Sequence, residues 1–187
     1  MAKANKSRYA ILGMLSAHPG SSGYDIRKMM TESTEFFWRE TFSSIYPVLD
    51  ELEKSGLISK QKPGLAPVSR NRKTYALTKE GKQELLKWLS KNVEPEQPRN
   101  ELLLKIFFGQ HVSLDQNHVH IEQYQRELSA KKVMLTQIRK SLPKEYADDP
   151  GLPFWLLTIE FGIERVQAGL NWCEFALKKL KTLRSKK

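Results

Sequence analysis

Three basic side chains, Arg70, Arg72 and Lys73, follow a stretch over residues 63–69 that contains two prolines, a glycine and a serine. This composition predicts an exposed turn. Guanidinium and ammonium groups on such a turn can lie along DNA phosphates or reach into the minor groove, where Arg is favoured. The alternative is a solvated cluster of charges that binds nothing. Phosphate binding is favoured here because a helix that could read DNA precedes the turn.

That helix carries hydroxyl groups. Ser43, Ser44 and Tyr46 fall on one side of a segment with helical spacing, and the apolar residues of the segment recur on the other side. The apolar residues are Ile45, Leu49 and Leu52. Hydroxyls at the amino-terminal end of a helix can bond phosphates or base edges, and the Tyr46 ring can contact a thymine methyl group. The alternatives are a serine that only caps the helix and a half-buried Tyr46 that only packs.

The charge of the chain indicates a polyanionic partner. It has 31 basic and 21 acidic residues, a formal net charge of +10. Residues 1–92 hold 16 basic and 9 acidic side chains, and the later residues hold 15 and 12. Because attraction to a polyanion follows the local field, the first half is the better candidate for a surface that binds double-stranded DNA. Lys28 lies in this half and either adds a phosphate contact or serves solubility alone.

Catalysis and metal binding find no support in the sequence. It has no Gly-rich phosphate loop, no nucleophile elbow and no Cys/His cluster with metal-ligand spacing, so we expect no enzyme, cofactor or bound metal. Cys173 is the only cysteine, which excludes an intrachain disulfide and fits a reducing cytoplasm. The apolar run over residues 9–15 is far shorter than a membrane span and lacks the cleavage site of a signal peptide, so we expect no membrane partner.

Two helices are predicted before the hydroxyl-bearing helix. Apolar residues over 9–15 form one helical face, which ends at His18-Pro19-Gly20. Ser21 or Ser22 can cap the next helix, and Asp25 stands three residues after Ser22, as in a capping box.

The third helix should begin at Ser43 or Ser44, because Pro47 is tolerated at low cost only in a first turn. Short strands over residues 58–62 and 73–77 flank the basic turn, and a fourth helix follows. The order of three helices, a strand, a basic hairpin, a strand and a helix predicts a winged helix-turn-helix, a mainly α fold with a small β-hairpin wing.

Prolines at 95 and 98 interrupt the pattern after the fourth helix. We therefore predict a winged helix-turn-helix domain over residues 1–92, a linker over 93–98 and an all-α dimerisation and effector domain over 99–187. The last helix of this domain has apolar residues at alternating spacings of three and four, which is typical of a helix-packing seam. The seam, which we expect at the dimer interface, comprises Leu156, Ile159, Ile163, Val166, Leu170, Cys173, Leu177 and Leu180.

The same helix carries a second apolar stripe, and two stripes suggest one packing partner within the subunit and another from a second subunit. The second stripe comprises Phe154, Leu157, Phe161, Ala168, Trp172 and Phe175. The aromatic residues Phe107, Phe108, Trp155 and Trp172 are candidates to bind a small aromatic effector, with core packing as the alternative.

A set of short segments in the first half resembles the PadR family of bacterial transcriptional regulators in order and spacing. The segments are Tyr9-Ala10-Ile11-Leu12, Ser22-Gly23-Tyr24-Asp25-Ile26, Phe37-Trp38, Ile45-Tyr46-Pro47-x-Leu49, Leu52-Glu53-x-x-Gly56-Leu57-Ile58 and Tyr75-x-Leu77-Thr78-x-x-Gly81. The pattern continues through Trp88-Leu89 and residues 98–105, as in the longer members of the family.

The resemblance implies a homodimer that binds an inverted-repeat operator, acts as a repressor and responds to a small molecule. Several members carry Lys or His just before the third helix, whereas this chain has Thr41 and Phe42, so contacts at those positions do not carry over. A ligand-independent activator and a winged-helix module that binds proteins are the alternative interpretations.

Overall fold

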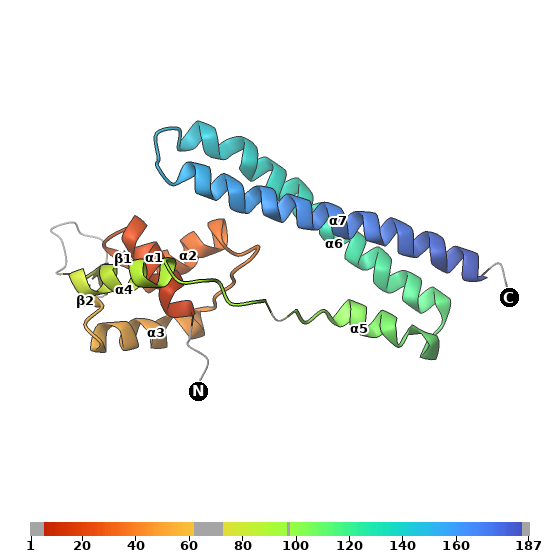
Figure 1. The fold of residues 1–187 in the computed structure, drawn as a ribbon, viewed down its shortest axis with the longest axis horizontal. Coiled ribbons are helices and arrows are strands. Elements are labelled where there is room, and N and C mark those ends of the chain that lie inside the picture. The colour runs from red at the N-terminus through yellow and green to blue at the C-terminus, as the bar shows by residue number, and fades with distance from the viewer. Residues whose placement is uncertain (1–5, 62–72, 97, 185–187) are drawn as a thin grey trace. The chain divides into compact units, whose positions relative to one another are not determined.

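A computed structural model describes residues 6–61, 73–96 and 98–184. The chain divides into two compact units, residues 1–95 and 96–187 (Figure 1). The first unit contains four helices and three short strands among its described residues, and in the second every described element is helical. No helix in the described ranges is long and apolar enough to cross a membrane.

Side-chain caps explain where α2 and α4 of the first unit begin. The helix α1 (Ser7–Ala17) ends at His18, as expected. Ser22 caps α2 (Gly23–Ser33) in a reciprocal capping box with Asp25, and Thr78 caps α4 (Lys79–Leu89). Each cap satisfies backbone N–H groups that the first turn of a helix leaves unpaired.

The start of α3 (Phe42–Lys54) differs from the prediction of Ser43 or Ser44. Thr41 is the N-cap, and Ser44 is the third helical residue, whose side chain accepts in turn from the Thr41 N–H. Pro47 consequently lies in the second turn of α3, where its missing N–H would have bonded the Ser43 carbonyl. Pro47 and Ser43 are both exposed, so water can satisfy that carbonyl.

The sheet contains a strand that the sequence pattern did not predict. Strand β1 (Ser21–Ser22) pairs antiparallel with β3 (Thr74–Leu77), which also pairs antiparallel with β2 (Ile58–Lys60), giving the order β1-β3-β2. A strand of two residues shows no alternation that could reveal it. The two predicted strands are shorter than expected, and the basic turn between them lies outside the described residues except for Lys73.

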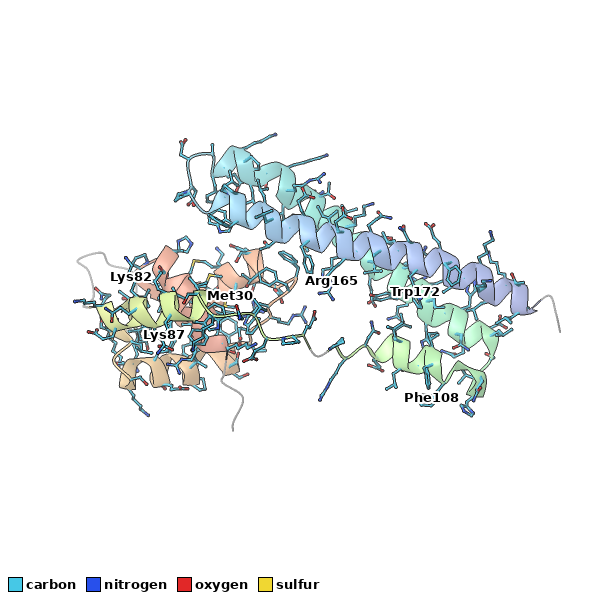
Figure 2. The ribbon with its side chains drawn as sticks, viewed as in Figure 1. Met30, Lys82, Lys87, Phe108, Arg165 and Trp172 are labelled. Carbon is cyan, nitrogen blue, oxygen red and sulfur yellow. The ribbon has the colours of Figure 1, made fainter. Side chains whose placement is uncertain are left out.

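Apolar side chains from α1, α2, α3 and the sheet form one core in the first unit. The residues at its centre are Ile11, Leu12, Leu15, Ile26, Met30, Ile45, Leu49 and Leu52, and Figure 2 labels Met30. The Tyr9 ring stacks on Trp88 of α4 with ring centroids 4.6 Å apart. This core fixes the inner face of α3 and therefore decides which of its residues face outward.

The second unit is built on a long antiparallel helix pair, α6 (Leu114–Glu145) and α7 (Leu152–Arg184), preceded by α5 (Glu101–Phe107) and the 3-10 helix η1 (Gly109–His111) (Figure 1). Ser113 caps α6. Gly169 allows α7 to approach α6 closely, because a Cβ at this position would lie 2.6 Å from Leu128 Cδ1. Arg139 of α6 and Glu160 of α7 form an ion pair at 3.1 Å.

The seam predicted as a dimer interface is packed within this helix pair. Ile159, Ile163, Val166 and Cys173 are buried in the single chain, where α7 packs on α6. These four side chains are already covered within one chain, which leaves little of their surface for a second subunit, and their role at a dimer interface stays a prediction. The remaining seam residues are partly exposed; they are Leu156, Leu170, Leu177 and Leu180.

Candidate nucleic-acid interface

The outer face of α3 is formed by the residues that the sequence pattern selected. Ile45, Val48, Leu49 and Leu52 are buried, while Ser43 and Tyr46 are exposed, Tyr46 to 49%. No charged residue occurs between Phe42 and Leu49, and the carboxyl-terminal half carries Asp50, Glu51 and Glu53. This helix therefore offers hydroxyl groups and aromatic rings to a groove at its amino-terminal end, and it offers no cation there.

The Ser44 hydroxyl forms its hydrogen bonds within the protein. Its hydroxyl lies 2.6 Å from Glu40 Oε2 and 2.8 Å from the Thr41 carbonyl oxygen, and it accepts a hydrogen bond from the Thr41 N–H at 2.9 Å. Glu40, with 7% of its surface exposed, also accepts from Trp38 Nε1 at 2.9 Å. The single proton of Ser44 is thus already donated, so this residue holds the start of α3 in place.

Tyr46 is positioned by close packing on Gly23, the first residue of α2. A Cβ at position 23 would lie 2.8 Å from Tyr46 Cε1 and 3.1 Å from Leu49 Cδ1, closer than side chains normally approach. Only glycine leaves room for the ring there. Sequence reasoning selected Tyr46 but missed Gly23, whose only signal is its place within the Ser22–Ile26 segment.

An exposed aromatic pair lies beside Tyr46. The rings of Tyr24 and Phe42 stack with centroids 6.0 Å apart and planes at 22°. The Arg27 guanidinium carbon lies 6.0 Å from the centroid of Phe42. Sequence reasoning set Phe42 aside because it departs from the Lys or His found in related chains.

The predicted phosphate-binding cations are only partly within the described residues. Lys73 is exposed directly before β3, whereas Arg70 and Arg72 lie outside the described ranges. Lys28 is exposed on α2 and forms a weak ion pair with Glu32 at 4.0 Å. On β2, a hydrogen bond from Lys60 to Glu53, at 2.7 Å, raises the pKa of the lysine and keeps it charged.

The four aromatic candidates for effector binding do not converge within one chain. Trp155 packs edge-on against Tyr146 with centroids 5.6 Å apart. Trp172 lies about 25 Å farther along α7 at ~1.5 Å per residue, and Phe108 caps the end of α5 (Figure 2). Phe107 and Phe108 contact each other edge-on at 5.1 Å. A single pocket formed by all four residues is therefore ruled out for one chain.

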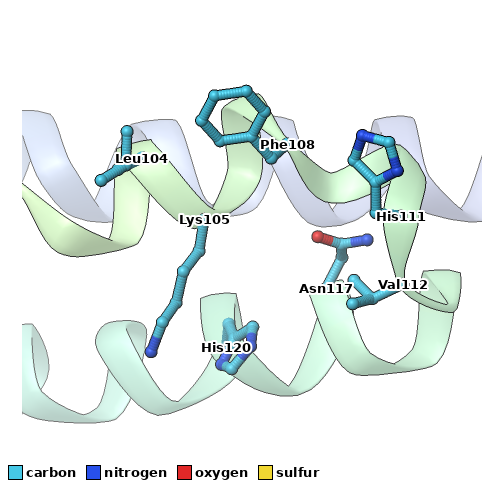
Figure 3. Close-up of a pocket in the computed structure, with 7 residues that line it drawn as sticks. All are labelled: Leu104, Lys105, Phe108, His111, Val112, Asn117 and His120. Atoms are coloured by element: carbon cyan, nitrogen blue, oxygen red, sulfur yellow. The ribbon is translucent and has the colours of Figure 1, made fainter.

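Phe108 does line a cavity of about 360 Å³ between α5, η1 and the start of α6 (Figure 3). The other lining residues are Leu104, Lys105, His111, Val112, Asn117 and His120. Lys105 extends from α5 toward α6, where His120 lies, while the Asn117 amide lies beside η1 (Figure 3). Asn117 Nδ2 donates to the carbonyls of Gly109 and Ser113 at 2.8 and 3.1 Å, so this side chain ties η1 to α6.

Comparisons with known proteins identify the family. Residues 11–87 match the transcriptional regulator PadR-like family, and residues 98–181 match the family described as virulence activator alpha C-term. The crystal structure of Bacillus subtilis PadR in complex with p-coumaric acid is 30% identical, with 93% of this chain and 98% of that chain covered and a TM-score of 0.70. This chain belongs to the PadR family.

Further relatives agree with this assignment. The negative transcriptional regulator PadR of Bacillus subtilis is 29% identical over 91% of this PadR-family chain and 94% of its own length. Its structure in complex with operator DNA covers 95% of this chain and 99% of that chain, with 28% identity and a TM-score of 0.83. The virulence activator AphA of Vibrio cholerae shares the fold at a TM-score of 0.73 and 21% identity, covering 94% and 98%. The predicted family, winged-helix fold and role in transcriptional regulation are confirmed.

Proposed function

We propose that this chain is a cytoplasmic repressor, without enzymatic activity, that binds an inverted-repeat operator as a homodimer and releases it on binding a small molecule. The observation that carries the proposal is the match, at a TM-score of 0.83 over 95% of the chain, to a relative in complex with operator DNA. The net positive charge of the first half and the neutral outer face of α3 fit the same function.

In this proposal α3 contacts the bases, and basic side chains outside α3 contact the phosphates. Its amino-terminal half has hydroxyls and rings but no cation, so base edges are its natural partners in the major groove. Phosphate neutralisation then comes from Lys28, Lys73 and the basic turn with Arg70 and Arg72. Ser43 and Tyr46 contact DNA directly in this proposal, and Ser44 positions them.

The second apolar stripe of α7 replaces the seam as the proposed dimer surface. Phe154, Leu157, Phe161 and Phe175 are large apolar side chains that remain mostly exposed in the single chain. They lie about 180° from the seam at ~100° per residue, so they face away from α6. A two-fold axis through this stripe would bring two recognition helices to successive major grooves, about 34 Å apart.

Ligand response is proposed from the relative that binds p-coumaric acid. A ligand releases DNA only if it binds the DNA-incompetent arrangement of the dimer more tightly than the DNA-bound arrangement. The test compound is therefore p-coumaric acid, with DNA affinity as the measured quantity.

Fluorescence anisotropy with duplex DNA from upstream of the chain's own coding sequence, at several salt concentrations, tests the proposal. We expect tight binding at low salt and a linear fall of log K with log salt. Replacing Arg70, Arg72 and Lys73 by Ala should reduce the slope by about 0.9 per lost phosphate contact, while Lys140→Ala, on α6, should leave it unchanged. Absence of salt-dependent duplex binding by the parent chain would overturn the proposal.

A further inference from the structure

Phe42 is an exposed aromatic side chain at the first position of α3, the helix proposed to enter the major groove. Its surface is 46% exposed, and the residue is not part of the core. Exposed large apolar side chains at a proposed binding surface call for a partner that buries them.

The ring of Phe42 is held in place from the protein side. Tyr24 stacks on it at 6.0 Å, and the Arg27 guanidinium lies 6.0 Å from its centroid. Arg27 is itself fixed by an ion pair with Glu35 at 3.6 Å. Three elements of the first unit therefore orient this ring: α2, the turn that follows it and the start of α3.

The chemistry of the major groove restricts what such a ring can contact. Residues at the amino-terminal end of a recognition helix approach base edges. A phenyl ring has no donor or acceptor for a phosphate oxygen or for the polar groups of those edges, and the thymine methyl is the apolar group that the edges present.

We propose that Phe42 is a specificity-determining residue that packs on thymine C5-methyl groups in the operator, with Tyr24 and Arg27 as its positioning residues. The inference rests on the proposed DNA-binding function, which it deepens by naming the group that is read. Neighbouring Tyr46 extends the same aromatic surface one turn farther along α3.

The experiment first enriches binding sequences from a pool of random duplexes with the full chain. The enriched duplex is then synthesised with thymine or with uracil at each of its thymine positions in turn, because uracil lacks only the methyl group. At least one position should lose about fourfold in affinity on this change, the effect of exposing about one buried methyl-sized group.

The variant Phe42→Ala should bind the thymine and uracil duplexes of that position equally, whereas Phe42→Leu should keep a preference for thymine. Leu86→Ala, which removes an exposed apolar side chain from α4, should retain the parental difference. Thermal unfolding should be similar for all three variants, since Phe42 is not part of the core.

The possible failures of the inference and of the proposed function are distinct. If no duplex is enriched, the DNA-binding function fails. If the parent binds tightly but never distinguishes thymine from uracil, or if Phe42→Ala keeps the distinction, DNA binding stands and the role of Phe42 is overturned.

Discussion

Two positions on α7 that are two residues apart distinguish the proposed intersubunit surface from the core within one chain. Phe161 is 60% exposed in the single chain, whereas Ile163, two residues later, is 8% exposed and packed in the helix pair. We expect Phe161→Asp to give a folded monomer. Ile163→Asp should instead unfold the second unit, because it places an unpaired charge between α6 and α7.

The exposed surface of Phe161 determines how strongly Phe161→Asp should weaken the dimer. A phenyl side chain of about 200 Å² that is 60% exposed offers about 120 Å² to a partner, or about 3 kcal/mol of burial per subunit. Two symmetry-related copies offer about 6 kcal/mol, which is roughly four powers of ten in the dimer dissociation constant as an upper limit. A dimer with a nanomolar dissociation constant would therefore become monomeric at micromolar protein.

The assay is analytical ultracentrifugation of the full chain at micromolar concentration, with circular dichroism to follow folding. Lys178→Asp, an exposed position on α7 outside the second stripe, serves as the control for added negative charge and should remain dimeric. A folded, fully dimeric Phe161→Asp would show that the dimer uses another surface. A monomeric but fully folded Ile163→Asp variant would show that the seam forms the dimer interface.

Three further predictions concern close packing and burial. Gly81→Ala should destabilise the chain by about 1–3 kcal/mol in urea unfolding, because a Cβ there would lie 1.9 Å from the backbone oxygen of Leu57; unchanged stability would mean that α4 shifts freely. Gly23→Ala should weaken DNA binding more than it lowers the melting temperature, because it displaces the exposed Tyr46 ring; an unchanged affinity would remove that ring from the interface. Burial raises the pKa of the Cys173 thiol, so iodoacetamide at pH 7.5 should modify this residue only in denaturant; rapid modification of the native chain would contradict its burial.

The elements of the first unit could be predicted where local signals decide them. Ser22 with Asp25 and Thr78 with its helix are capping patterns that depend on a few neighbouring residues, and the predicted capping box of Ser22 and Asp25 forms. The helix α3 begins earlier than predicted, because its capping box closes with Ser44 in place of the usual Glu or Gln. Strand β1 depends on pairing with residues more than fifty positions away, which no local pattern records.

In the second unit, sequence periodicity was not sufficient for a different reason. Both apolar stripes of α7 are visible in the sequence, but periodicity alone does not say which stripe the chain covers itself. The deciding residues are Gly162 and Gly169: both lie on or beside the seam, and Gly169 lets Leu128 of α6 pack against α7. Small residues on one stripe indicate a close helix approach on that side, so they were the available signal for the intrachain face.

The interface around α3 explains why affinity and specificity should respond to different mutations. Its amino-terminal end is uncharged, and the carboxylate of Glu40 is buried against Trp38 and Ser44 instead of facing a phosphate. A change on this helix therefore alters contacts to bases without altering the number of phosphates neutralised, so it should shift sequence preference and leave the salt dependence intact. A change at Lys73 should do the reverse, lowering the salt dependence equally on every sequence.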